Sequence, residues 1–177
     1  DRGLTKALPD SKVNDMAGVL RWSAHQQSKH GAKYHINTDV NDRITMVFYT
    51  VEGSQEVWDR CYGMRLAFFD TIHGMKVGCV TTMDQDGKLT LLAVGILKRE
   101  EGRTFRWVFD RLKESFRSEP DVLLTDGDLA MAAAAGLSFH RCAHLLCIWH
   151  LGENLGKHAK RLFPQRGTNP DTNEKAR

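Results

Sequence analysis

Two aspartates follow apolar segments that are typical of buried β-strands. Asp70 closes the segment 65–70, and Asp126 closes the segment 121–126. If the two strands are parallel neighbours, both carboxylates lie at the same edge of the sheet, where open α/β folds build their sites. Carboxylates this close repel each other unless a divalent cation bridges them, and their oxygens suit a pair of Mg²⁺ or Mn²⁺ ions that support phosphodiester chemistry. The simpler alternative is that Asp126 and Asp128 cap the next helix and that Asp70 begins a turn.

A second group of candidate residues combines thiols and imidazoles. Cys147 and His150 are separated by two residues, a spacing that can place two ligands on one zinc ion. A structural zinc site needs four ligands, and Cys142 and His158 are the further candidates nearby. These four residues would make the chain a small zinc-stabilised binding module. The alternative is a packed thiol and a histidine with ordinary structural hydrogen bonds.

The excess of positive charge lies at the C-terminal end. The chain has 25 Lys and Arg against 22 Asp and Glu, and residues 151–177 hold 6 basic and 3 acidic residues. A basic segment favours an acidic partner such as a nucleic acid. Lys157, Lys160 and Arg161 are therefore candidates for contacts with DNA phosphates. The alternative is that these residues only solvate the exposed face of a helix.

Composition excludes several classes of protein. A chain of 177 residues, 41% hydrophobic and 27% charged, allows one folded domain of ordinary size and excludes wholesale disorder. The apolar run 89–97 is about half of the roughly 20 residues that a membrane-spanning helix needs, so membrane insertion is excluded. Four irregularly spaced cysteines indicate reduced thiols in an intracellular protein. The chain begins with Asp1, so we expect an excised or processed piece.

The first 63 residues are expected to pack on the core as an N-terminal helix, a β-hairpin and a short helix. Asp10 or Ser11 can cap an amphipathic helix that Gly31 ends. Segments 33–39 and 44–51 are rich in β-branched and aromatic residues and flank the turn dipeptide at Asn41, which predicts a hairpin. A short helix is predicted over 54–61.

The rest of the chain must position the two aspartates. The pattern predicts three consecutive strands, a helix, a short buried strand, an alanine-rich helix after Asp128 that ends near Gly136, another strand and a last helix. The predicted ranges are 65–70, 76–83, 88–97, 101–117, 122–124, 128–136, 140–146 and 148–163. A meander followed by helix–strand alternation predicts an α/β sheet of mixed strand directions, flanked by helices. Residues 164–177 are expected to form a flexible tail.

Three motifs in this order resemble the transposase domain of Mutator-like elements (MULEs). They are Phe69-Asp70-Thr71, the segment from Leu124 to Met131, and Cys147-Ile148-Trp149-His150-Leu151 with Asn154. Plant regulators of the far-red-impaired-response type, which derive from such transposases, share the pattern. The resemblance covers about residues 66–155, and the strand pair and helix before it extend the similarity to about residue 34.

The resemblance implies a ribonuclease H-like fold, here over residues 64–163, in which the first and fourth strands are parallel neighbours. The first and second catalytic acids of the family match Asp70 and Asp126, with Mg²⁺ or Mn²⁺ as cofactor. Cys147 and His150 match a family marker that could position the strand and helix near the site. The family's tyrosine-containing stretch is replaced by Ile72-His73-Gly74. The third acid, a glutamate, is expected beyond this chain, and Glu153 is the candidate within it.

The leading hypothesis is therefore the catalytic-core portion of a nuclear DNA transposase. Its partners would be transposon ends and target DNA, and a homo-oligomer is compatible with this function. The alternative is a domesticated, non-catalytic DNA-binding or transcription regulator that keeps the fold. The zinc-stabilised binding module is a third hypothesis.

Overall fold

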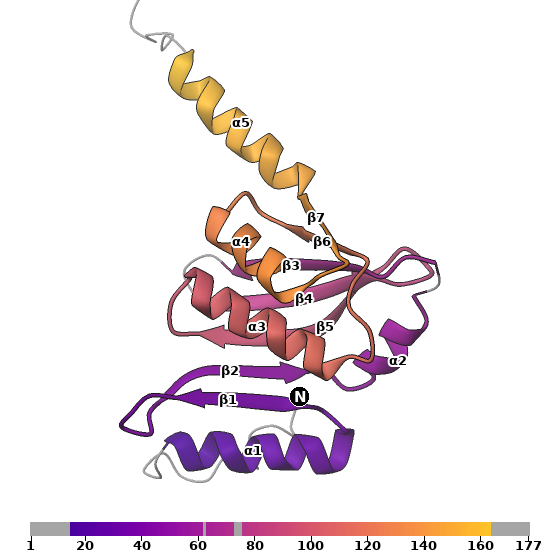
Figure 1. Cartoon of the computed structure of the whole chain (residues 1–177), viewed down its shortest axis with the longest axis vertical. Coiled ribbons are helices and arrows are strands. Elements are labelled where there is room, and N and C mark those ends of the chain that lie inside the picture. The colour runs from indigo at the N-terminus through magenta and orange to yellow at the C-terminus, as the bar shows by residue number, and fades with distance from the viewer. Residues whose placement is uncertain (1–14, 62, 73–75, 164–177) are drawn as a thin grey trace, which may run out of the picture.

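The computed structural model describes residues 15–61, 63–72 and 76–163. Within them the chain forms a mixed α/β fold with a seven-stranded sheet and five helices (Figure 1). The predicted helix start at Asp10 or Ser11, the residues His73 and Gly74, and the predicted tail 164–177 lie outside the described residues. The elements are α1 (Asp15–His30), β1 (Tyr34–Thr38), β2 (Ile44–Thr50), α2 (Ser54–Asp59), β3 (Leu66–Ile72), β4 (Val77–Met83), β5 (Leu89–Leu97), α3 (Gly102–Ser115), β6 (Val122–Thr125), α4 (Leu129–Ser138), β7 (Ala143–Leu146) and α5 (Ile148–Leu162).

The strand order in the sheet is β1-β2-β5-β4-β3-β6-β7. Strands β3, β4 and β5 form an antiparallel meander, and the turn between β4 and β5 uses Gly87 with a φ of 74°. The β1–β2 hairpin joins the same sheet because β2 pairs antiparallel with β5. Strands β3, β6 and β7 are parallel to one another. The predicted sheet of mixed direction is therefore confirmed, and the N-terminal hairpin is part of it.

The core lies between the sheet and the helices α3 and α4, which cover the same face (Figure 1). The apolar spacing of α3 places Phe105 and Phe109 against Phe69 of β3, with ring planes at 77° in both pairs. Each fully buried side chain of this size contributes about 1.5–3 kcal/mol, and edge-to-face aromatic pairs add about 0.5–1.5 kcal/mol more. This packing fixes β3, the strand that carries Asp70.

One glycine is required by the close approach of the Phe69 ring to β4. A Cβ atom added to Gly78 would lie 2.6 Å from two carbon atoms of that ring. Such a distance is well inside van der Waals contact, so any larger residue must displace the ring. Gly78 therefore lets β3 and β4 pair while Phe69 stays in the core.

Element ends differ from the sequence-based prediction at several places; for example, α2 ends at Asp59 and not at Cys61, and α3 ends at Ser115 and not at Arg117. Strand β3 continues to Ile72, so Asp70 lies inside the strand and not at its end. Helix α4 continues to Ser138, two residues beyond Gly136, because helical hydrogen bonding tolerates a glycine in an otherwise alanine-rich segment. Strand β7 starts at Ala143 and not at His140, because β6, its only partner among the described strands, reaches no further.

Helix α5 projects from the end of β7, away from the sheet (Figure 1). None of its residues is buried, although it carries an apolar stripe that includes Ile148, Leu155 and Leu162. Exposure of these three side chains is 83%, 72% and 75%. Among the described residues, no helix is both long and apolar enough for a membrane span.

Candidate functional site

Asp70 lies in the middle of the sheet with its side chain 56% exposed. It pairs with Cys79 across β3 and β4, and its Oδ1 accepts a hydrogen bond from the amide of Thr71 at 2.8 Å. Burial raises the pKa of the Cys79 thiol, and the negative charge of Asp70 raises it further. Cys79 is therefore a protonated, neutral neighbour of the carboxylate.

The pairing of β3 with β6 aligns the two aspartates. Leu66, Ala67 and Phe68 lie opposite Val122, Leu123 and Leu124 in a parallel register. Asp70 lies two residues beyond the last residue of β3 in this pairing, and Asp126 lies two residues beyond the last residue of β6 in it. The parallel neighbourhood that the sequence-based argument assumed for these two strands is therefore present.

Asp126 is half-buried directly after β6, at the start of the connection to α4. Its Oδ1 accepts a hydrogen bond from the amide of Asp128 at 3.0 Å. Asp128 in turn caps α4, because its Oδ1 accepts from the amide of Met131 at 2.8 Å. The alternative interpretation of the sequence, in which these residues cap the next helix, thus holds for Asp128. Asp126 instead accepts a hydrogen bond within the turn that precedes the cap.

A hydrogen-bond chain from His144 holds the backbone of Asp126. The hydroxyl of Thr125 donates to the carbonyl oxygen of Asp126 at 2.9 Å and lies 2.8 Å from Nε2 of His144. Because a hydroxyl has one hydrogen, Nε2 of His144 must be the donor to Thr125. Burial lowers the pKa of His144, which favours the neutral imidazole. This role of Thr125 and His144 could not be predicted from the sequence, because the spacing of residues along the chain does not show which residues meet on neighbouring strands.

The Cys147-x-x-His150 motif places an imidazole beside Asp70. The amide of Cys147 donates to the carbonyl oxygen of Thr125 at 2.7 Å, so the start of α5 is tied to the end of β6. One helical turn later, Nε2 of His150 lies 3.6 Å from Oδ2 of Asp70. This separation is too long for a good hydrogen bond, and the contact is an ion pair only when the imidazole is protonated. The other ring nitrogen, Nδ1, is buried without a hydrogen-bond partner among the described residues.

The other predicted site residues are not brought to Asp70 and Asp126. Glu153, Lys157, Lys160 and Arg161 are all exposed on the projecting helix α5. Nη2 of Arg161 lies 3.2 Å from Nδ1 of His158.

The candidate zinc ligands are dispersed in the same way. The Sγ of Cys142 contacts the carbonyl oxygen of Ala143 at 3.7 Å, and burial raises the pKa of this thiol to about 11. Over residues 15–61, 63–72 and 76–163, no three His, Cys, Asp or Glu side chains are grouped so that they could hold a metal ion. The zinc site and the third acid stay predictions.

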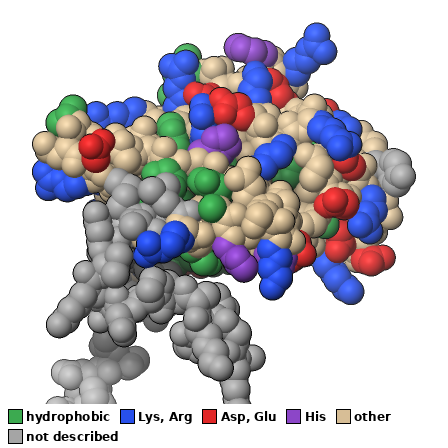
Figure 2. Space-filling model, turned by 90° about the horizontal axis from the view of Figure 1, so that it is seen from below, with side chains coloured by type: hydrophobic (Ala, Val, Ile, Leu, Met, Phe, Trp, Pro, Cys, Tyr) green, Lys and Arg blue, Asp and Glu red, His purple; other side chains and the backbone are tan. Residues whose placement is uncertain are grey.

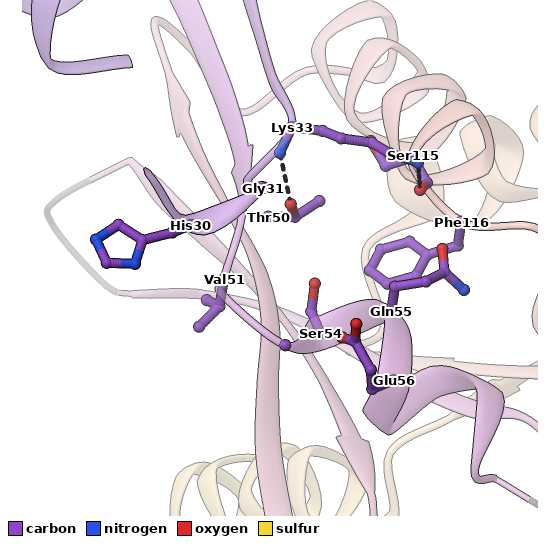
Figure 3. Close-up of a pocket in the computed structure, with 11 residues that line it drawn as sticks. His30, Gly31, Lys33, Thr50, Val51, Ser54, Gln55, Glu56, Ser115 and Phe116 are labelled. Carbon is purple, nitrogen blue, oxygen red and sulfur yellow. Dashed lines mark hydrogen bonds between the residues drawn. The ribbon is translucent and has the colours of Figure 1, made fainter. Parts of the chain in front are cut away.

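A polar cavity of about 120 Å³ lies between the N-terminal segment and the end of α3 (Figure 3). The amide of Lys33 donates to Oγ1 of Thr50 at 2.9 Å, and the ammonium group of Lys33 donates to the carbonyl oxygen of Ser115. Neither aspartate lines this cavity. It is smaller than the cavity of about 150 Å³ that can hold a benzene molecule, so we assign it no organic ligand.

The fold and these contacts define a class of protein. It is an α/β domain with a mixed sheet, in which Asp70 lies on β3 and Asp126 directly follows the parallel neighbour β6. His150 of α5 contacts Asp70. Residues 68–154 match the family model of the MULE transposase domain. The chain therefore carries a domain of the MULE transposase family, and the resemblance seen in the sequence is confirmed over these residues. No curated protein matches the chain.

Proposed function

We propose that this chain is the catalytic-core portion of a Mutator-like DNA transposase, which cleaves and transfers DNA strands when complete. The observation that carries the proposal is the parallel pairing of β3, which contains Asp70, with β6, which Asp126 directly follows. Both aspartates lie inside the matched segment 68–154. Transposon ends and target DNA are the proposed partners, and the nucleus is the proposed location.

The proposal includes a ribonuclease H-like core made of β3 to α5. In that fold the first and fourth strands are parallel neighbours, and here the first core strand, β3, pairs in parallel with the fourth, β6. The meander β3-β4-β5 followed by helix–strand alternation supports the same assignment.

Asp70 and Asp126 are the proposed ligands of Mg²⁺ or Mn²⁺. Their carboxylates supply the hard oxygen donors that these ions prefer, and a Mg²⁺ ion held by one or two carboxylates keeps several waters. The exposed carboxylate of Asp70 fits such a solvated ion. A bound ion would activate the attacking hydroxyl and stabilise the leaving oxygen of a phosphodiester. His144 and Thr125 would hold the backbone of Asp126 in place for this role.

DNA contacts are proposed for α5, where Lys157, Lys160 and Arg161 are exposed. Figure 2, which views the molecule from the end that carries α1, shows basic and acidic side chains interspersed among the described residues. Each phosphate contact contributes about 0.9 to the slope of log affinity against log salt concentration.

A second candidate function is the domesticated, non-catalytic regulator. It is favoured by one observation, namely that Glu153 lies exposed on α5 and no group of three acidic or other metal-binding side chains occurs in the described part of the chain. A fold of this kind could bind DNA without cutting it.

Binding of Mn²⁺ to the whole chain, followed by the electron paramagnetic resonance of the free ion, tests the leading proposal. The unmutated chain is expected to bind Mn²⁺, and Asp70→Asn and Asp126→Asn are each expected to weaken binding about tenfold or more, equal to about 1.4 kcal/mol. Asp128→Asn is the matched control, because asparagine caps a helix as well as aspartate does.

The same experiment separates the two functions. An unmutated chain that binds no Mn²⁺, or variants that bind it as tightly, would reject the metal site. If the chain then still binds DNA, and the two aspartate variants bind DNA with unchanged affinity, the non-catalytic regulator is supported.

A further inference from the structure

An aromatic cavity of about 220 Å³ lies between α1 and the β1–β2 hairpin. Its wall includes Trp22, Ser23 and Gln26 of α1, Tyr34 of β1, Tyr49 of β2 and Glu52. All of these residues precede the matched segment 68–154, and none of them belongs to the proposed transposase site. We name it the aromatic pocket.

Three aromatic rings form the wall of the aromatic pocket. Tyr34 and Tyr49 are cross-strand partners in the β1–β2 ladder, which sets them side by side on one face of the sheet. The ring of Trp22 stands on Tyr49, with centroids 5.4 Å apart and planes at 85°. Two rings at a right angle form a corner, and the face of an aromatic ring carries the negative part of its quadrupole. Such a corner attracts a cation.

The polar residues that line the pocket also favour a cation. Glu52 is the only charged side chain among the described lining residues, and it is 66% exposed, so solvent can reach its carboxylate. One of its oxygens, Oε2, already lies 2.9 Å from Nδ1 of His30. No Lys or Arg is among the described lining residues. Ser23 is fully buried, and its hydroxyl has no hydrogen-bond partner among the described residues. Because this oxygen has almost no accessible area, it does not contact a group inside the pocket.

The volume of the pocket and the hydrogen-bonding needs of the ligand restrict which cations can bind. An apolar cavity of about 150 Å³ can hold a benzene molecule, whereas pockets for drug-sized ligands begin at about 300 Å³. The aromatic pocket lies between these limits, so it fits one compact head group. An unmethylated ammonium has three N–H donors that all need acceptors. A quaternary ammonium has none, so it enters a largely aromatic pocket without losing hydrogen bonds.

We propose that the aromatic pocket binds a methylated ammonium group, as found in choline or in a trimethylated lysine side chain. The rings of Trp22, Tyr34 and Tyr49 contact the methyl groups, and Glu52 neutralises the charge.

The test is a titration of the whole chain, with the shifts of the indole and tyrosine resonances in NMR spectra as the readout. The ligands are tetramethylammonium, choline, trimethyllysine, n-butylammonium and 3,3-dimethylbutanol, the last of which has the shape of choline without its charge. The methylated cations are expected to bind at least tenfold more tightly than butylammonium and dimethylbutanol. The tighter of choline and trimethyllysine identifies the source of the head group.

Two variants locate the binding site. Glu52→Gln removes the charge from an exposed side chain and is expected to weaken binding severalfold, with Glu56→Gln as its matched control. Trp22→Leu keeps an apolar wall without the indole ring and is expected to abolish binding, with Trp149→Leu on α5 as its control. Equal affinity for dimethylbutanol and choline, unchanged binding by both variants, or no binding of any methylated cation would overturn the proposal.

Discussion

Hydrogen bonds from neighbouring residues hold both the main chain and the carboxylate of Asp126. Its main-chain oxygen receives the Thr125 hydroxyl, which His144 holds from β7, and its carboxylate receives the amide of Asp128. This arrangement joins two parallel strands and a helix start at one residue. The aspartates themselves could be predicted from the sequence because each follows an apolar run. The His144 to Thr125 bond could not, because it joins residues whose proximity depends on the register of β6 and β7.

Thr125→Val tests this hydrogen-bond chain. Valine keeps the shape of a side chain that is 1% exposed but removes the hydroxyl, which leaves the His144 Nε2–H group without its partner. We expect the free energy of unfolding to fall by about 1–3 kcal/mol, the usual result of leaving one buried partner unsatisfied. Urea denaturation measures it.

The control for this variant is Thr81→Val, at a half-buried position on β4. If both variants lower the free energy of unfolding equally, the hydrogen bonds through Thr125 and His144 contribute no additional stability. A larger loss for Thr125→Val, together with a shifted amide resonance of Asp128, supports the arrangement.

At the scale of elements, the strands were predicted more closely than the contacts between them. Alternation of apolar residues and turn residues located β1 to β5 to within two residues at each end. The sequence did not reveal that β3 runs past Asp70, because pairing with β4 as far as Val77 decides where the strand ends. The sequence pattern alone could not establish that β3 and β6 are parallel neighbours, because strands far apart in the chain leave no local signal of their pairing.

Glycine substitutions test the packing of these elements. Gly78→Ala is expected to lower the free energy of unfolding by about 1–3 kcal/mol, because the new Cβ overlaps the buried Phe69 ring. Gly136→Ala in α4 meets no atom within 4 Å and is expected to raise it by about 0.5–1 kcal/mol through helix propensity. Guanidinium denaturation of both variants distinguishes the two effects. Equal changes of the same sign would contradict the close approach of β3 and β4.

At the scale of the whole molecule, the described chain consists of a packed α/β body and one projecting helix. The helix predicted over 148–163 is confirmed, and its apolar stripe is also what a packed helix would show. Only the arrangement in space reveals that this face contacts none of the described core. Stability should therefore reside in the body.

Paired substitutions compare α5 with the body. Leu155→Asp, at a side chain 72% exposed, is expected to change the free energy of unfolding by no more than about 0.5 kcal/mol. Leu112→Ala, at a side chain 3% exposed in α3, is expected to lower it by about 2–5 kcal/mol. Urea titrations of the whole chain measure both. A loss at Leu155 comparable to that at Leu112 would mean that α5 is packed in solution.

The contact between His150 and Asp70 has a mechanical consequence for α5. The first turn of the helix contains His150, which contacts Asp70. The amide of Cys147, just before the helix, donates a hydrogen bond to Thr125 at the end of β6. Helix α5 therefore begins beside Asp70. A group that binds Asp70 would compete with the imidazole for the carboxylate and change the surroundings of the first turn of α5. Trp149, 65% exposed next to His150, would then tumble faster, and the anisotropy of its fluorescence would report events at the carboxylate from outside the sheet.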